Sequence, residues 1–440
     1  MGSIFKAYDI RGVYGRDLDE ATAEAIGRAF VTFLKCRKVV VGQDMRPHSD
    51  PLFAALARGI TRQGADVVHL GLCSTPMAYN AINFLHADAG VMITASHNPG
   101  EWNGFKLCRD RAIPISGQTG IKDIEKIALS GGFAAAAAVP GKISRFDIEK
   151  EYVRHVGALF AMRKPIRAVA DYANAMGICE AAAIKPMVAL DPLFDTLDGT
   201  FPNHEANPLK TGTLRALQAR VLSGGYDFGV AFDGDADRAG FVDEKGAVIP
   251  MDMITALIAQ DILKRGKGKI LYDLRSSRAV KEVVQECGGQ PMMCRVGHAF
   301  IKQQMRAEDA LFAGELSGHY YFRDNYFTES SAMATLSIAS LLSAGGKPLS
   351  ELIRPLCRYS KSEEINSEVP DADAVFKRLR EAYRNGRMFE LDGLSVEFPD
   401  WWFNVRSSNT EPLVRLNLEA SSPGQLEARQ KEILGIIRKS

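Results

Sequence analysis

Short apolar runs alternate along most of the chain with segments of helical periodicity. The runs at 38–44, 89–93 and 269–273 are typical of buried strands, whereas 51–63 and 277–287 repeat apolar residues at helical spacing. Strands that alternate with helices of this length predict βαβ units, in which helices cover both faces of a parallel or mixed sheet. In such sheets, ligands gather beyond the carboxyl ends of the strands.

One order of strands and polar loops occurs three times, although the copies share little sequence identity. The third strand of each copy runs into a chemically rich loop, at Ser96, Asp233 and Glu315. The copies differ at the position of their second strand. The third copy is predicted to have a strand there, over 292–298, whereas the second copy is predicted to have only a loop, around 198–204. Equivalent strand ends are expected to face one cleft.

The pattern divides the chain into four predicted domains. The glycine- and alanine-rich stretch 131–141 is typical of a connection, and a helix over 146–160 is expected to open the second domain. After Ser362 the pattern changes to a helix over 372–385, successive strands and a closing helix, which predicts a small α+β domain with an antiparallel sheet. The expected boundaries are 1–145, 146–246, 247–360 and 361–440.

Composition narrows the class of protein. At 440 residues more than one hydrophobic core is expected, and 46% hydrophobic with 24% charged residues is ordinary for a globular enzyme. The net charge of +1 gives no electrostatic support for binding nucleic acid or membranes. There is no apolar run of spanning length, no signal-peptide pattern and no C-x-x-C pair among seven scattered cysteines. We therefore expect a cytoplasmic protein without a disulfide framework or a structural zinc site.

The segment DGDADR, at 233–238, carries the strongest chemical signal. Its three carboxylates stand at every second position, so that in an extended segment they point to one side and converge on a hard cation; they are Asp233, Asp235 and Asp237. Oxygen-only ligands favour Mg²⁺ over zinc or copper. Glu244 occupies the twelfth position of an EF-hand, but Arg238 replaces its required glycine and both flanks are predicted strands, so a calcium loop is rejected.

Two further loops and one serine complete the candidate site. Ser96, in the TASHNP loop, offers a hydroxyl nucleophile at the carboxyl end of a strand. The RSSNTEP loop at 406–412, followed by Arg415, has guanidinium, hydroxyl and amide groups that suit a phosphate. In the GELSGH loop, Glu315 offers a carboxylate to sugar hydroxyls. His298 adds a titratable group whose role, structural or catalytic, is left open.

Together these groups indicate phosphoryl transfer involving a phosphorylated polyol, where catalysis is positioning plus charge neutralisation. A serine hydrolase is excluded, because the chain lacks a G-x-S-x-G elbow and the three aspartates would have no task.

The chain resembles the α-D-phosphohexomutase superfamily, and specifically the bacterial phosphomannomutase/phosphoglucomutase family. The resemblance runs in order along essentially the whole chain and also includes KAYDIRG at 6–12 and NGFK at 103–106. It implies three topologically similar α/β domains with mixed sheets, plus a smaller C-terminal α+β domain, around a central cleft. It also implies that the fourth domain opens and closes.

The resemblance implies a role for each matching residue. Ser96 is implied to carry the phosphoryl group and to bind Mg²⁺ together with Asp233, Asp235 and Asp237. The implied catalytic neighbours of the phosphoserine are Arg11, Lys106, Arg238 and His97, with His298 matching a residue proposed to assist proton transfer. The implied substrate-binding residues are Tyr8, Arg275, Glu315, Ser317, His319, Arg406, Ser408, Asn409, Thr410 and Arg415. Arg275 stands where a lysine is usual, so a general-acid role there is in doubt.

The implied activity interconverts hexose 1-phosphate and hexose 6-phosphate, of mannose or glucose, through a phosphoserine and a 1,6-bisphosphate. Glucose or mannose 1,6-bisphosphate is the expected activator, hexose phosphates are the expected partners, and a monomer is expected, with a dimer as the alternative. GELSGH is close to the GEMSGH of mannose/glucose mutases, whereas phosphoglucosamine mutases usually have glutamine between Glu and Ser. A phosphoglucosamine mutase therefore ranks second, ahead of a Mg²⁺-dependent sugar phosphatase and a catalytically silent sugar-phosphate-binding protein.

Overall fold

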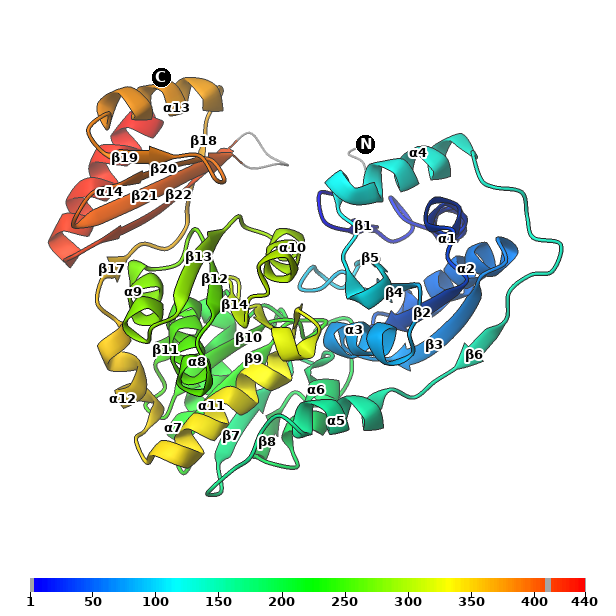
Figure 1. Cartoon of the computed structure of the whole chain (residues 1–440), viewed down its shortest axis with the longest axis horizontal. Coiled ribbons are helices and arrows are strands. Elements are labelled where there is room, and N and C mark those ends of the chain that lie inside the picture. The colour runs from blue at the N-terminus through cyan, green and yellow to red at the C-terminus, as the bar shows by residue number, and fades with distance from the viewer. Residues whose placement is uncertain (1–3, 408–412, 440) are drawn as a thin grey trace.

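The computed structural model describes residues 4–407 and 413–439, which form four units, each built on one sheet (Figure 1). The first unit (blue) and the fourth (orange and red) lie on opposite sides of the view, and the green and yellow units lie below them. The strand orders are β1-β5-β4-β2-β3-β6, β11-β10-β9-β7-β8, β13-β12-β14-β15-β16 and β17-β22-β21-β20-β19, with β18 also paired to β22.

The strands are short and fall into the four sheets in chain order. The first sheet contains β1 (Ile10–Val13), β2 (Lys38–Gln43), β3 (Asp66–Leu72), β4 (Ala89–Ile93), β5 (Trp102–Arg109) and β6 (Ile143–Arg145). The second contains β7 (Arg167–Asp171), β8 (Ala189–Leu193), β9 (Phe228–Phe232), β10 (Ala239–Asp243) and β11 (Val248–Ile249). The third contains β12 (Lys269–Asp273), β13 (Gln290–Cys294), β14 (Phe312–Gly314), β15 (Tyr320–Phe322) and β16 (Thr328–Glu329). The fourth contains β17 (Ser360–Lys361), β18 (Ile365–Glu368), β19 (Arg387–Phe389), β20 (Leu394–Glu397), β21 (Trp401–Ser407) and β22 (Leu413–Ala420).

The helices connect and cover these strands. In the first two units they are α1 (Glu20–Leu34), α2 (Ser49–Arg62), α3 (Thr75–Phe84), α4 (Lys122–Ser130), α5 (Glu149–Gly157), α6 (Gly177–Ile184) and α7 (Arg215–Leu222). In the last two they are α8 (Met251–Arg265), α9 (Arg278–Glu286), α10 (His298–Glu308), α11 (Ser331–Gly345), α12 (Leu349–Ile353), α13 (Ala372–Ala382) and α14 (Pro423–Ile437). Across the described residues, none of these helices is both long and apolar enough to cross a membrane.

The first three sheets share one four-strand core. A central strand lies between two parallel neighbours, and one neighbour also pairs with an antiparallel strand, which gives β3-β2-β4-β5, β8-β7-β9-β10 and β13-β12-β14-β15. The predicted threefold pattern is therefore confirmed as topology. Because β4, β9 and β14 are equivalent, the loops at Ser96, Asp233 and Glu315 leave the same edge of their sheets.

Strand β2 shows why the strands appear in the sequence as continuous apolar runs rather than as alternating apolar and polar residues. Val39 and Val41 pack in a cluster with α1 and α2, whereas Val40 faces the other way, into a cluster with α3. All three side chains are at most 1% exposed. A strand buried on both faces cannot alternate between apolar and polar residues, and the predicted α/β layering is confirmed.

Two elements differ from the expectation. Strand β8 lies upstream of the loop at 198–204; it is an edge strand, and Asp191 and Pro192 interrupt its apolar run. The strand expected over 292–298 already ends at Cys294. Gly297, with φ of 122°, turns the chain so that α10 begins at His298.

The fourth unit has the predicted antiparallel sheet and its own core. Its strands pair antiparallel throughout, and Val405, Leu416 and Ile433 are fully buried in a separate cluster. A different cluster runs through the first three units, from Val40 to Phe312. The proposed domain boundaries themselves stay a prediction.

Glu180, in α6, is a buried contact at which the first three units meet. Its carboxylate accepts hydrogen bonds from the Ser74 hydroxyl (2.5 Å), the Tyr152 hydroxyl (2.8 Å), the Ser331 hydroxyl (3.3 Å) and the Ala332 N–H (3.1 Å). The residue is completely buried. Burial raises the pKa of Glu180 to about 7, although the four donors oppose this shift.

We predict that Glu180 makes stability fall with rising pH. The folded protein binds the proton more tightly than the unfolded chain, whose ordinary glutamate pKa is 4.5. The contribution, about 3 kcal/mol, is therefore complete below the unfolded pKa and is lost as pH rises through the folded one. In Glu180→Gln, melting temperatures measured between mildly acidic and mildly alkaline pH should fall less steeply than in the wild type. Glu381→Gln, at an exposed position on α13, is the control and should keep the wild-type slope. Equal slopes in all three proteins would contradict the prediction.

Candidate active site

Ser96 lies just after β4 in a left-handed backbone conformation, with φ of 51°. A non-glycine residue keeps this conformation only when its surroundings fix it. Its hydroxyl donates to Asp233 Oδ2 at 2.8 Å and lies 3.2 Å from Nδ1 of His97, and its N–H donates to the Thr94 hydroxyl at 2.9 Å. The serine loop of the first unit therefore contacts the aspartate loop of the second directly.

Arg46, which was not predicted from the sequence, fixes the backbone of the serine loop. Its guanidinium pairs with Asp44 at 3.1 Å, and both side chains are completely buried. It also donates to the carbonyl oxygens of Ser96 (2.8 Å), Asn98 (2.7 Å), Pro99 (2.6 Å) and Trp102 (2.9 Å). The available signal was an Asp-x-Arg pair directly after an apolar strand.

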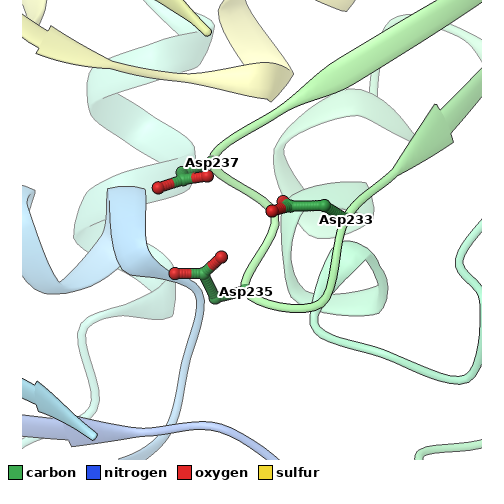
Figure 2. Close-up of side chains that lie close together, drawn as sticks. All are labelled: Asp233, Asp235 and Asp237. Atoms are coloured by element: carbon green, nitrogen blue, oxygen red, sulfur yellow. The ribbon is translucent and has the colours of Figure 1, made fainter. Parts of the chain in front are cut away.

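Asp233, Asp235 and Asp237 lie in the loop between β9 and β10, and their side chains point toward one another (Figure 2). One carboxylate oxygen of each lies within 4.8 Å of the others, and all three residues are at most 2% exposed. Burial and repulsion by its two neighbours raise the pKa of Asp233 well above its ordinary value. Asp235 Oδ1 is buried without a hydrogen-bond partner in the described part of the chain. A buried donor set of oxygens alone fits a hard divalent cation.

Lys106 and Arg238 bring positive charge to these carboxylates. The Lys106 ammonium lies 2.5 Å from Oδ2 of both Asp235 and Asp237. Although burial opposes it, this ammonium lowers the pKa of Asp237 well below its ordinary value. The Arg238 guanidinium lies 3.7 Å from Asp233 and 3.9 Å from Asp237. The negative charge of the aspartate loop is therefore partly neutralised by Lys106 of the first unit and by Arg238 of the loop itself.

Arg11 and His97 stand beside the serine. Arg11 pairs with Asp9 at 2.7 Å and donates to Asn98 Oδ1 at 2.5 Å. The Arg238 guanidinium, burial and Arg11 together lower the pKa of His97 to about 2. A histidine held neutral in this way is a poor general base, but it remains a hydrogen-bonding partner for the neighbouring hydroxyl.

The loop after β14 brings the third unit to the same place. The Ser317 hydroxyl donates to Glu315 Oε2 at 3.0 Å and lies 2.8 Å from Nδ1 of His319. Nε2 of His319 lies 3.2 Å from Asp237 Oδ1. The Tyr321 hydroxyl donates to the other oxygen of Glu315 at 2.5 Å. Both oxygens of the Glu315 carboxylate are thus held by hydrogen bonds. His319 brings the same loop into contact with the aspartate loop.

Arg275 is held beside this loop by two carboxylates. Its guanidinium lies 2.7 Å from Asp273 and 3.7 Å from Glu315. Burial opposes the charge, but Asp273 raises the pKa of Arg275 above its already high ordinary value. Arg275 can therefore contribute a fixed positive charge and cannot act as an acid.

Tyr8 and His298 join the first and third units across the cleft. Their ring centroids are 5.9 Å apart, and the Tyr8 hydroxyl donates to the Val296 carbonyl at 3.2 Å. Burial, followed by the charge of Lys302, lowers the pKa of His298 well below its ordinary value. Nδ1 of His298 is buried and has no hydrogen-bond partner among the residues described. In the unliganded protein this imidazole is therefore neutral and, like His97, a weak base, with one ring nitrogen left to contact a ligand.

Arg406 and Arg415 face each other on β21 and β22 in the fourth unit. Both contact Glu364, at 2.8 Å and 3.5 Å. Glu364 was not predicted as a site residue, because nothing in the neighbouring sequence distinguishes it from the adjacent Glu363. The predicted phosphate-binding residues Ser408, Asn409 and Thr410 lie outside the described residues.

A cleft of about 400 Å³ joins these groups, and all four units line it. Among the residues selected from the sequence, its lining includes Tyr8, Arg11, Lys106, Asp237, Arg238, Arg275, His298, Glu315, Ser317, His319, Arg406 and Arg415. Ser96, His97, Asp233 and Asp235 contact this set directly or through one another.

Four family models match the chain in succession. Residues 2–135, 150–246 and 250–359 match the phosphoglucomutase/phosphomannomutase alpha/beta/alpha domains I, II and III, and 364–436 match the C-terminal domain of the same family. The chain belongs to the phosphoglucomutase/phosphomannomutase family. It is therefore a phosphohexomutase, an isomerase of hexose phosphates, and the predicted superfamily and enzyme class are confirmed.

Relatives of this phosphohexomutase match it over nearly the full length. A phosphomannomutase of Salmonella montevideo is 40% identical over 448 residues, covering 98% of each chain. A phosphomannomutase of Methanocaldococcus jannaschii is 38% identical and covers 99% of this chain and 98% of its own. The crystal structure of a phosphoglucomutase/phosphomannomutase family protein from Burkholderia thailandensis superposes with a TM-score of 0.92, at 32% identity, covering 99% and 98% of the two chains.

Gly234 lies where the aspartate loop packs against the backbone of the serine loop in this family member. A Cβ at this position would lie 2.2 Å from the carbonyl oxygen of Ser96. We predict that Gly234→Ala pushes the loops apart and lowers kcat/KM of the mutase reaction by about a hundredfold, the effect of a displacement of about 1 Å in a catalytic site. Gly212→Ala, where a Cβ meets nothing within 4 Å, should keep wild-type activity. Full activity of Gly234→Ala would show that this contact is dispensable.

Proposed function

We propose that this phosphohexomutase interconverts mannose 1-phosphate and mannose 6-phosphate, and likewise the glucose phosphates, with Ser96 as the phosphoryl carrier. The observation that carries the proposal is the hydroxyl of Ser96 at 2.8 Å from Asp233, beside a cleft that extends to two arginines of the fourth unit. The phosphomannomutase names of the relatives and the apolar Leu316 of the sugar loop support the choice of sugar.

Mg²⁺ is the proposed resident cation, held by Asp233, Asp235 and Asp237 with an oxygen of Ser96. The buried, oxygen-only donor set supports this assignment, as does Asp235 Oδ1, which has no hydrogen-bond partner among the residues that the structure describes. When bound, the ion would offset negative charge on the phosphoryl oxygens.

The residues around Ser96 are proposed to stabilise a phosphoserine. Arg11, Lys106 and Arg238 place three cationic side chains at this end of the cleft, which favours the dianion and the charge spread over its oxygens during transfer. His97, held neutral, orients the serine oxygen rather than taking its proton.

The sugar is proposed to be held by Glu315, Ser317 and His319, with Tyr8 and Arg275 along the same wall. Attack of a sugar hydroxyl on phosphorus forms one O–P bond and breaks the bond to the serine oxygen. The hydroxyl proton passes to Nδ1 of His298, which has no hydrogen-bond partner among the described residues and whose lowered pKa rises when phosphate anions enter the cleft. The same proton is then returned to the Ser96 oxygen that has lost its bond to phosphorus. The second transfer, from the 1,6-bisphosphate back to serine, reverses these steps.

The phosphate that does not react is proposed to bind Arg406 and Arg415, with Ser408, Asn409 and Thr410 completing the contacts. The 1,6-bisphosphate of glucose or mannose is then both the intermediate and the activator that primes the serine. The monomeric state, with a dimer as the alternative, and the cytoplasmic location stay predictions.

We predict that the protein, primed with glucose 1,6-bisphosphate and Mg²⁺, converts mannose 1-phosphate and glucose 1-phosphate faster than glucosamine 1-phosphate. Ser96→Ala should lower kcat by about a thousandfold or more, because the phosphoryl carrier is lost, while its melting temperature and sugar-phosphate binding persist. ³¹P NMR follows both the sugar phosphates and the phosphoserine. Ser130→Ala, at an exposed position, is the matched control.

Three results would redirect the proposal. Unchanged turnover in Ser96→Ala would remove the assigned carrier. Faster conversion of glucosamine 1-phosphate would favour a phosphoglucosamine mutase. Release of free phosphate without any need for the bisphosphate would identify a phosphatase.

A further inference from the structure

Glu364 places a carboxylate in the part of the cleft that is proposed to bind an anion. Its Oε2 accepts hydrogen bonds from Arg406 Nη2 at 2.8 Å and from the Asn417 amide at 3.2 Å, and its Oε1 lies 3.5 Å from Arg415 Nη1. Glu364 lines the same cleft as the two arginines. Neither the sugar-binding nor the phosphoryl-transfer roles proposed above require a negative charge here.

A carboxylate and a phosphate compete for the same guanidinium groups, because arginine donates bidentate hydrogen bonds to both. Burial opposes the charge of Glu364, but Arg406 lowers the pKa of this carboxyl and keeps it ionised. The two arginines and the glutamate therefore sum to one positive charge. Nε of Arg406 and Nε of Arg415 are buried without hydrogen-bond partners in the described part of the chain, so both retain capacity for a further anion.

We propose that Glu364 is an internal competitor for the phosphate that does not react. Its carboxylate pairs with Arg406 and Arg415 whenever that phosphate leaves. This competition weakens phosphate binding enough for the 1,6-bisphosphate to reorient in the cleft. The inference rests on the proposed function, in which each phosphate of the 1,6-bisphosphate must occupy this end of the cleft in turn.

The physical reason lies in the release step. If the phosphate left two partly buried guanidinium groups without any anion, their unpaired charge would oppose its departure. An attached carboxylate keeps them paired in both states, so the free-energy difference between bound and released phosphate becomes smaller. Glu364 acts through the arginines and is therefore a positioning residue rather than a catalytic one.

The test compares Glu364→Gln with Glu363→Gln. Glutamine keeps the size of the side chain and an oxygen that can accept from Asn417, but it removes the charge. Calorimetric titration with inorganic phosphate should show binding on the order of tenfold tighter in Glu364→Gln, a change that corresponds to ~1.4 kcal/mol. In the mutase assay KM and kcat should both fall, since the phosphate is held more tightly and released more slowly. Glu363→Gln, at an exposed neighbouring position, should match the wild type in both measurements.

Two further variants make each outcome decisive. Glu364→Ala also removes the charge, so it should show the same tightening, whereas Glu364→Asp keeps the charge and should bind phosphate more weakly than either. Equal or weaker phosphate binding in both uncharged variants would mean that the carboxylate only orients the arginines, and would overturn the inference.

Arg406→Met separates failure of the inference from failure of the proposed function. Its phosphate binding should be largely lost, and the titration component that disappears defines the site in question. Binding as tight as in the wild type would show that Arg406 does not hold phosphate, which would remove the proposed site itself rather than the role of Glu364 within it.

Discussion

The burial of three aspartates in one short loop is the constraint on which the rest of the site depends. Carboxylates this close repel one another, and burying them is unfavourable unless positive charges and hydrogen-bond donors surround them. Those partners come from three separate units. Lys106 contacts the loop from the first unit, Arg238 from the loop itself and His319 from the third. The Thr75 hydroxyl, at the start of α3, adds a hydrogen bond to Asp235 at 2.6 Å. The aspartates can therefore be buried only when the first three units are packed correctly against one another.

Topology explains how one cleft collects so many charged groups. Each of the first three units ends its equivalent strand at the same sheet edge, so three loops of unrelated sequence can specialise separately while remaining close together. The fourth unit contributes its arginines from adjacent antiparallel strands. Because the chemistry is divided among units in this way, the loops can differ in sequence without disturbing the sheets that position them.

Features whose interacting residues are close together in the sequence could be predicted, whereas features that join distant residues could not. The aspartates are two positions apart, and their apolar flanks indicate a strand end, so both the element and its chemistry were predictable. Strand β8 was missed because an edge strand tolerates the aspartate and proline that break its pattern. Arg46 and Glu364 were missed for a different reason. Their partners lie some fifty residues away, and only the folded backbone of the serine loop, or the pairing of β21 with β22, brings them together.

The separate core of the fourth unit bears on how the chain folds and melts. One buried cluster runs through the first three units, whereas the cluster around Val405 and Leu416 contains only residues of the fourth, as far as the described residues extend. Cooperativity in unfolding follows shared buried contacts. The fourth unit can therefore open locally without breaking the buried cluster that joins the first three units, so that the wall of the cleft carrying Arg406 and Arg415 moves while the aspartate loop keeps its contacts with Lys106 and Arg238.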